Sequence, residues 1–94
     1  MNKFKLGQLV VTRAIADKMQ TDKKFTRFVQ LSLERYINCD WGSMADEDKA
    51  INDAAVKSGE DRIHAAYVNE SGDRIWIITE WDRSVTTILL PSDY

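Results

Sequence analysis

The sequence predicts one α+β domain, 1–94, in which a three- to four-stranded antiparallel sheet carries about three helices on one face. Two observations predict this class. Residues 62–90 contain three β-rich runs separated by two polar turns. Residues 13–57, which precede them, place apolar side chains at helical spacing between capping signals. The order is therefore β-α-α-α-β-β-β, and a chain of 94 residues can bury a small core.

The N-terminal half predicts one strand and two helices. The apolar run Leu6–Thr12 suits a strand, and its last residue is placed to cap a short helix over Arg13–Met19. A second helix is expected over 22–38, capped by Thr21 or Asp22. Its apolar residues recur at helical spacing and are Phe25, Phe28, Val29, Leu33, Tyr36 and Ile37.

A third helix is expected over 44–57, because both of its ends carry signals. Ser43 is placed as the N-terminal cap, with Asp46 three residues further on. Acids fill the first turn, where the helix dipole favours them, and Gly59 fits the left-handed position after the last turn. The thin apolar stripe of this helix consists of Ile51, Ala54 and Ala55.

The C-terminal third predicts an antiparallel meander, which the N-terminal strand joins. Its strands are 62–68, 74–80 and 84–90, with turns at Asn69–Asp73 and Glu80–Ser84. Alternation places one set of side chains against helix 22–38, namely Ile63, Ala65, Tyr67, Ile75, Ile77, Val85, Thr87 and Leu89.

Composition narrows the function classes. Apolar residues make up 44% and charged residues 30% of the chain, which is ordinary for a folded soluble protein. Met1–Leu6 lacks the apolar stretch of a signal peptide, and no run approaches the roughly 20 apolar residues of a membrane span. A single cysteine, Cys39, excludes an internal disulfide and fits a reducing compartment. We therefore expect a cytoplasmic protein with no membrane partner.

Charge is unevenly distributed along the chain, although the net charge is only −2. Residues 1–39 hold eight bases and three acids, whereas residues 40–61 hold two bases and seven acids. Residues 62–94 hold three bases and five acids. A basic N-terminal half beside an acidic central segment predicts a polarised surface, although such charges also occur on solvated helix faces that pair with one another.

Side chains for metal or cofactor chemistry are sparse. His64 is the only histidine, so a zinc site built from histidine and cysteine lacks ligands. Cys39 would need His64 beside it to act as a nucleophile, and the acidic segment lacks the spacing of a calcium loop. Glycine-rich phosphate loops and RNA-recognition motifs are absent. We expect no metal and no cofactor.

Two clusters are candidates for contact with a protein partner. The turn of the last hairpin contributes Trp81, Asp82 and Arg83, and an exposed tryptophan there would be an interface anchor. The acidic segment contributes Asp40, Trp41, Glu47 and Asp48. A purely structural role is the alternative at the tip, where Asp82 and Arg83 would form a network that fixes the turn.

Two other functions stay open. If Asp40, Glu80, Asp82 and Arg83 converged in one cleft, they would suit a small carboxylate-dependent hydrolase or nuclease-like enzyme. A nucleic-acid-binding accessory protein is the third hypothesis. It depends on the basic residues of the first two helices, among which no reading helix stands out.

One set of residues, spread along the chain and densest after Cys39, forms a family-like pattern. It comprises Asp40-Trp41-Gly42, Glu47-Asp48-Lys49, Asn52, Ala55, Gly59, Arg62, Ala66-Tyr67, Trp76-Ile77-Ile78-Thr79-Glu80, Asp82-Arg83-Ser84, Thr86-Thr87, Leu89-Leu90-Pro91 and Tyr94. The pattern resembles a family of small bacterial, plasmid and phage proteins usually called plasmid-related proteins. The resemblance covers nearly the whole chain.

This resemblance implies a mobile genetic element and an accessory role, including counter-defence of the anti-CRISPR or anti-restriction kind. The partner would then be a host defence component. The chain departs from the family at Asn38-Cys39, where a glycine is expected before Asp40, and at Trp81, where a small residue is usual. An exposed Trp81 would therefore be a contact particular to this chain.

Overall fold

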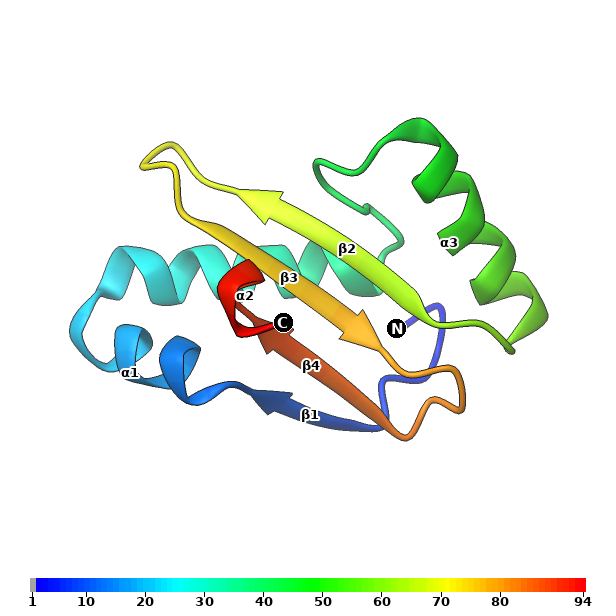
Figure 1. Cartoon of the computed structure of the whole chain (residues 1–94), viewed down its shortest axis with the longest axis horizontal. Coiled ribbons are helices and arrows are strands. Elements are labelled where there is room, and N and C mark those ends of the chain that lie inside the picture. Colours follow the sequence, from blue (N-terminus) through cyan, green and yellow to red (C-terminus); the bar gives the residue numbers. More distant parts are fainter. Residues whose placement is uncertain (1) are drawn as a thin grey trace.

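The computed structural model describes residues 2–94; Met1, the first residue of the segment compared with a signal peptide, lies outside them. Four strands and three α-helices confirm the α+β class (Figure 1). In chain order the elements are β1 (Gln8–Val11), α1 (Arg13–Thr21), α2 (Lys23–Ile37), α3 (Asp46–Ser58), β2 (Ile63–Val68), β3 (Arg74–Thr79) and β4 (Val85–Leu89), followed by a 3-10 turn, η1 (Pro91–Asp93).

The sheet is mixed, whereas the sequence analysis predicted an antiparallel one. Its strand order is β1-β4-β3-β2. The meander of β2, β3 and β4 is antiparallel as predicted, but β1 runs parallel to β4, with Gln8 opposite Val85 and Val11 opposite Ile88. Hydropathy marks a strand without giving its direction, so the pattern of residues 6–12 did not contain this information.

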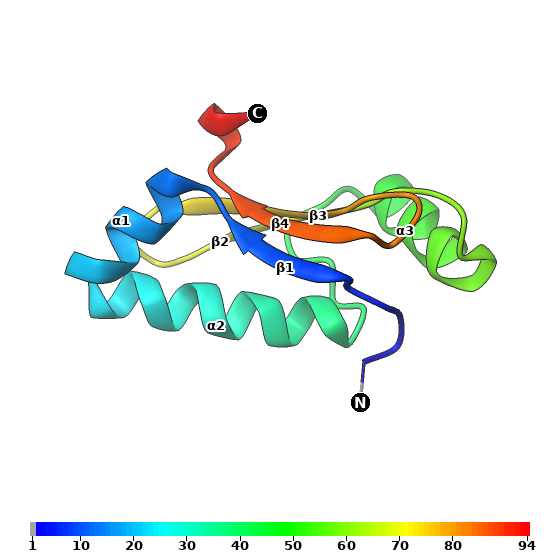
Figure 2. The same cartoon turned by 90° about the horizontal axis from the view of Figure 1, so that it is seen from below.

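One face of the sheet packs on α2, and η1 lies over the other face (Figure 2). The α2 face carries the main core, which includes Phe25, Val29 and Tyr36 of the helix. The prediction for β4 was wrong by one residue. Ile88 pairs with Ile77 and Thr86 with Thr79, so Val85, Thr87 and Leu89 lie on the opposite face, where Leu89 pairs with Trp76.

A buried chain of hydroxyl groups determines which residues of β4 face α2. The Thr86 hydroxyl donates to the Leu6 carbonyl at 2.7 Å, so its oxygen accepts from Thr79, also at 2.7 Å. Thr79 in turn accepts from the Tyr36 hydroxyl at 2.6 Å. Burial raises the pKa of Tyr36, which keeps this hydroxyl protonated. Two threonines therefore face the core because hydrogen bonds satisfy them there.

The N-terminal caps of α1 and α2 are those predicted from the sequence, and the cap of α3 is not. The Thr12 side chain accepts from the Ile15 amide and the Asp22 side chain from the Phe25 amide, which confirms both predicted caps. Ser43 is not the cap of α3, because Ala45 holds that position without a side-chain bond and the Ser43 hydroxyl donates to the Ala66 carbonyl. Gly59 ends α3 in the left-handed conformation, with φ 73°, as predicted.

The predicted apolar stripe of α3 was right for Ala55 and wrong for Ile51 and Ala54. Ala55 and Asn52 are its buried residues, whereas Ile51 and Ala54 are exposed. The sequence predicted about three helices on one face of the sheet, but α3 lies beside the edge of β2 and not on the face that α2 covers (Figures 1 and 2). At this edge, a polar side chain can bond the free backbone groups of the strand. This position shapes the candidate site.

Candidate partner-binding surface

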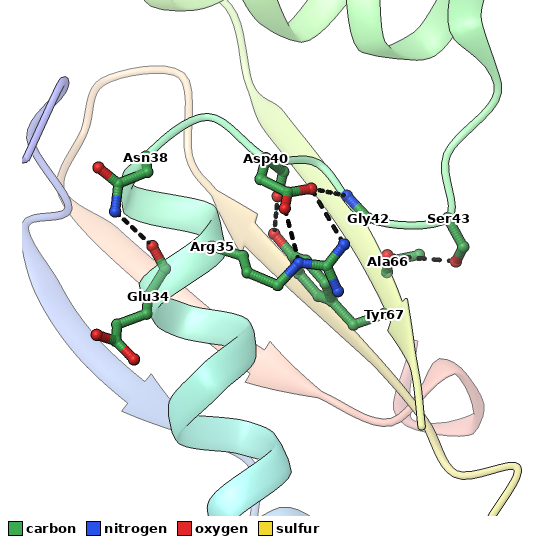
Figure 3. A network of polar contacts seen from close by, with 8 residues as sticks. All are labelled: Glu34, Arg35, Asn38, Asp40, Gly42, Ser43, Ala66 and Tyr67. Carbon is green, nitrogen blue, oxygen red and sulfur yellow. Dashed lines mark hydrogen bonds and ion pairs between the residues drawn. The ribbon is translucent and has the colours of Figure 1, made fainter. Parts of the chain in front are cut away.

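The segment before α3 docks on the outer edge of β2 (Figure 3). Gly42 forms a parallel bridge with Ala66, and the Ser43 amide donates to the Ala66 carbonyl at 2.8 Å. Gly42 has φ +72°, and a Cβ there would overlap the Ala66 carbonyl and the Tyr67 ring. Only glycine fits this close approach of two backbones.

Asp40 closes the same loop against α2. Its carboxylate accepts two hydrogen bonds from Arg35, at 2.8 and 3.1 Å, and one from the Gly42 amide (Figure 3). The hydrogen bond from Arg35 holds the pKa of Asp40 below its usual value. The Arg35 guanidinium also lies over the Tyr67 ring, whose hydroxyl donates to the Asp40 carbonyl. Asp40 is thus occupied in positioning the loop.

Trp41 is buried, with 3% of its surface exposed. Its ring packs edge-on against Tyr36, and its indole N–H donates to Asp53 of α3 at 2.8 Å. The side chain therefore joins the core to α3 and offers no surface to a partner. Of the candidate residues in the acidic segment, Asp40 and Trp41 thus position α3, and Glu47 and Asp48 remain at the surface.

Asn52 anchors the middle of α3 on β2. Its side-chain amide donates to the His64 carbonyl at 2.8 Å and its carbonyl accepts from the His64 amide at 3.2 Å. One side chain therefore satisfies both outward backbone groups of an edge residue. Apolar periodicity did not predict that Asn52 faces the sheet, although Asn52 belongs to the pattern that resembles the plasmid-related proteins.

Arg83 ties the hairpin tip to the C-terminal end of α3. Its guanidinium donates to the Ala55 carbonyl at 2.8 Å and the Asp61 carbonyl at 2.7 Å, with longer bonds to Glu80 and Trp81 at 3.2 and 3.1 Å. A cation suits the end of a helix, where carbonyls carry partial negative charge. Arg83 reaches these partners from a left-handed backbone position, with φ 60°.

Asp82 fixes the turn independently of Arg83. Its carboxylate accepts from the Ser84 amide at 3.0 Å and the Ser84 hydroxyl at 2.6 Å, and the hydroxyl bond lowers its pKa. The predicted turn network exists, but the two residues bond different partners. Trp81, which precedes Asp82, is 65% exposed, which identifies it as a free aromatic side chain at the tip.

A hollow of about 490 Å³ lies between α3 and β2. Its lining includes Asp48 and Ile51 of α3 and Asp61, Arg62 and His64 beside or on β2. Ile51 is 58% exposed and so presents a large aliphatic side chain to solvent beside Asp48. We define the α3–tip surface as Glu47, Asp48, Ile51, Asp61 and Trp81. Within this surface, the bonds from Arg83 to the Ala55 and Asp61 carbonyls connect the hairpin tip to the end of α3.

A cluster of rings borders this hollow on the face of the sheet opposite α2. Trp76 packs against His64 and Tyr94, with ring centroids 4.6 and 5.5 Å away, and Arg62 donates to the Tyr94 hydroxyl at 2.9 Å. Burial lowers the pKa of His64, and its Nε2 atom is buried without a hydrogen-bond partner among residues 2–94. Trp76 lies between Ile75 and Ile77, which face α2, so strand alternation places its ring on this opposite face.

The groups required by the enzyme hypothesis do not share partners. The Asp40 carboxylate bonds Arg35 and Gly42, the Asp82 carboxylate bonds Ser84, and the Arg83 guanidinium bonds backbone carbonyls. In the described part of the chain, no group of three or more His, Cys, Asp or Glu side chains is arranged to hold a metal ion. The geometry offers an acidic contact surface with two apolar side chains, Ile51 and Trp81.

Comparison with models of known protein families, with curated proteins and with solved structures finds no match. Within residues 2–94, no helix has the length and apolar character needed to cross a membrane.

Proposed function

We propose that this chain is a binding protein that acts by contact with a protein partner through its α3–tip surface. The observation that carries the proposal is the exposed Trp81, held beside an acidic helix by the backbone contacts of Arg83. A tryptophan in such a position is an effective anchor because it buries a large rigid surface at little entropic cost. The partner surface is expected to be basic around an apolar pocket.

The fold supports this role by holding α3 rigidly. Asp40, Trp41 and Gly42 tie its entrance to β2 and the core, Asn52 ties its middle, and Arg83 ties its end. A preorganised surface loses less entropy on binding than a flexible one. Asp40, Trp41, Gly42, Asn52 and Arg83, which hold α3 in place, all belong to the pattern that resembles the plasmid-related proteins.

The biological setting is part of the same proposal. Resemblance to the plasmid-related proteins supports an accessory role in a mobile genetic element, with counter-defence of the anti-CRISPR or anti-restriction kind as the specific form. The protein would then act in the cytoplasm, and its partner would be a host defence component. This element of the proposal depends on the sequence pattern alone.

The test uses tagged protein to recover a partner from host lysate, followed by binding kinetics on the purified pair. Trp81→Ala is expected to weaken binding by about 2 kcal/mol, roughly 30-fold, mainly through faster dissociation. Glu47→Lys with Asp48→Lys is expected to slow association, and the effect should shrink in high salt.

Matched controls come from the opposite side of the chain. Leu9→Ala removes another exposed apolar side chain, on β1, and Asp17→Lys with Glu34→Lys makes the same change in net charge on α1 and α2. The control variants should bind as the unmodified protein does. Equal binding by the α3–tip variants and the controls would place the interface elsewhere.

A further inference from the structure

A second surface lies at the end of the molecule opposite α3, where α2 begins and β2 turns into β3 (Figure 1). A hollow of about 340 Å³ there is lined from α2 by Lys24, Arg27, Phe28 and Leu31, and from the end of β2 and the following turn by Val68, Asn69, Glu70 and Ser71. The four α2 residues follow the i, i+3, i+4, i+7 spacing and so form one continuous stripe. The proposed function does not use this hollow.

Its floor contains apolar side chains that the core does not need. Leu31 is 41% exposed, and Phe28, three residues before it on α2, packs partly against the core. Because Phe28 and Leu31 are three residues apart on one helix, their side chains are neighbours and give the hollow an apolar wall.

The edge of β2 is open at this point. Alternation along the strand directs the backbone amides and carbonyls of His64, Ala66 and Val68 to the same edge. Asn52 bonds this edge at His64, and Ser43 bonds it at Ala66. Val68, two residues further, lies beyond both partners and inside the hollow, so an extended chain could pair there.

Charge identifies the occupant. Two bases, Lys24 and Arg27, line the hollow against one acid, Glu70, and Lys23 precedes them on the same helix. Nucleic acid fits less well, because single strands bind by stacking on exposed aromatic rings, and the one ring that lines this hollow, Phe28, packs partly against the core. We infer that the hollow between α2 and the β2–β3 turn docks an acidic polypeptide segment of a partner protein. One bulky apolar side chain of that segment would contact Leu31 and Phe28, while its carboxylates face Lys24 and Arg27.

The test is selection from a displayed library of random 12-residue peptides on the immobilised full chain. Enriched peptides should be net acidic with a bulky apolar residue, and their binding should weaken with salt. Lys24→Glu with Arg27→Glu should weaken binding about tenfold or more. Leu31→Asp should abolish it, and because Leu31 is exposed the fold should survive; Leu31→Ser provides a milder second variant.

Trp81→Ala is the matched control, since it removes the anchor of the α3–tip surface and should leave peptide binding unchanged. This separates failure here from failure of the proposed function. The inference is overturned if no peptides are enriched, if enriched peptides are neutral or basic, or if the Leu31 variants bind them equally. It is also overturned if Trp81→Ala abolishes binding, or if oligo-dT is bound and displaces the peptides.

Discussion

Gly42 and Gly59 provide a matched pair of substitutions that isolates the docking of the α3 entrance on β2. Both residues adopt the left-handed conformation, with φ +72° and +73°. A Cβ on Gly59 meets nothing within 4 Å, whereas a Cβ on Gly42 would overlap the Ala66 carbonyl and the Tyr67 ring. Alanine at either position incurs the same backbone penalty, and only at Gly42 does it also force two backbones apart.

The expected magnitudes follow from these contacts. Gly59→Ala should cost about 1 kcal/mol for the left-handed backbone alone. Gly42→Ala should cost about 3 kcal/mol or more. The clash must be relieved by moving the loop, which loses the bond from the Ser43 amide to Ala66, worth about 1 kcal/mol, and disturbs packing around Tyr67. The difference of about 2 kcal/mol corresponds to roughly 10 °C in Tm for a domain of this size.

Urea unfolding followed by tryptophan fluorescence and by circular dichroism measures both variants, and Trp41 reports directly on the loop because it is buried beside it. The m-values should match the unmodified protein, so that midpoints convert to free energies. If the two variants lost the same stability within 0.5 kcal/mol, the close approach of Gly42 to β2 would not contribute, and the account of how α3 is held would be wrong.

Three further predictions address the tip, the core and pH. Arg83→Met should cost about 2 kcal/mol in thermal unfolding, from two short bonds to carbonyls at about 1 kcal/mol each after allowance for partial exposure. Arg74→Met, at an exposed arginine, should change little, and equal losses would contradict the role of Arg83. Thr79→Val should cost about 1–3 kcal/mol, because it leaves the buried Tyr36 hydroxyl only its longer contact, 3.5 Å, with the Ile63 carbonyl. The double variant with Tyr36→Phe should lose less stability than the sum of the two single losses, and losses that simply add would contradict the hydroxyl chain. Because the folded pKa of His64 is depressed, its stabilising contribution is complete above about pH 6.5 and is lost as pH falls toward the folded value; His64→Gln should flatten that part of the stability profile, and an unchanged slope would exclude His64.

The sequence predicted the elements of this fold better than the faces they present. Capping signals located α1 and α2, and the acidic first turn with Gly59 located α3. The sequence could not predict which alternate side chains of β4 are buried. Val85, Thr86 and Thr87 are all suited to strands, and neither alternating set is clearly apolar. Hydrogen bonds between residues far apart in the chain decide which set is buried.

The candidate site shows the same division. Trp81 was singled out as a tip aromatic, and the structure shows it exposed. Trp41 and Asp40 were grouped with it, but their bonds to Asp53 and Arg35 place them in the support of α3. Such bonds connect separate elements, so no local pattern in the sequence predicts them. Ile51 is the reverse case, an apolar residue on a helix whose buried face is partly polar.

The most direct test of the binding proposal is site-specific photocrosslinking in host cells. A photoreactive amino acid at Trp81 or Ile51 should give an adduct with the same partner, identified by mass spectrometry. The same probe at Leu9 or Gln20, both exposed and outside the α3–tip surface, should give none. Adducts of equal yield from all four positions, or from Leu9 and Gln20 alone, would contradict the proposal that this chain acts through its α3–tip surface.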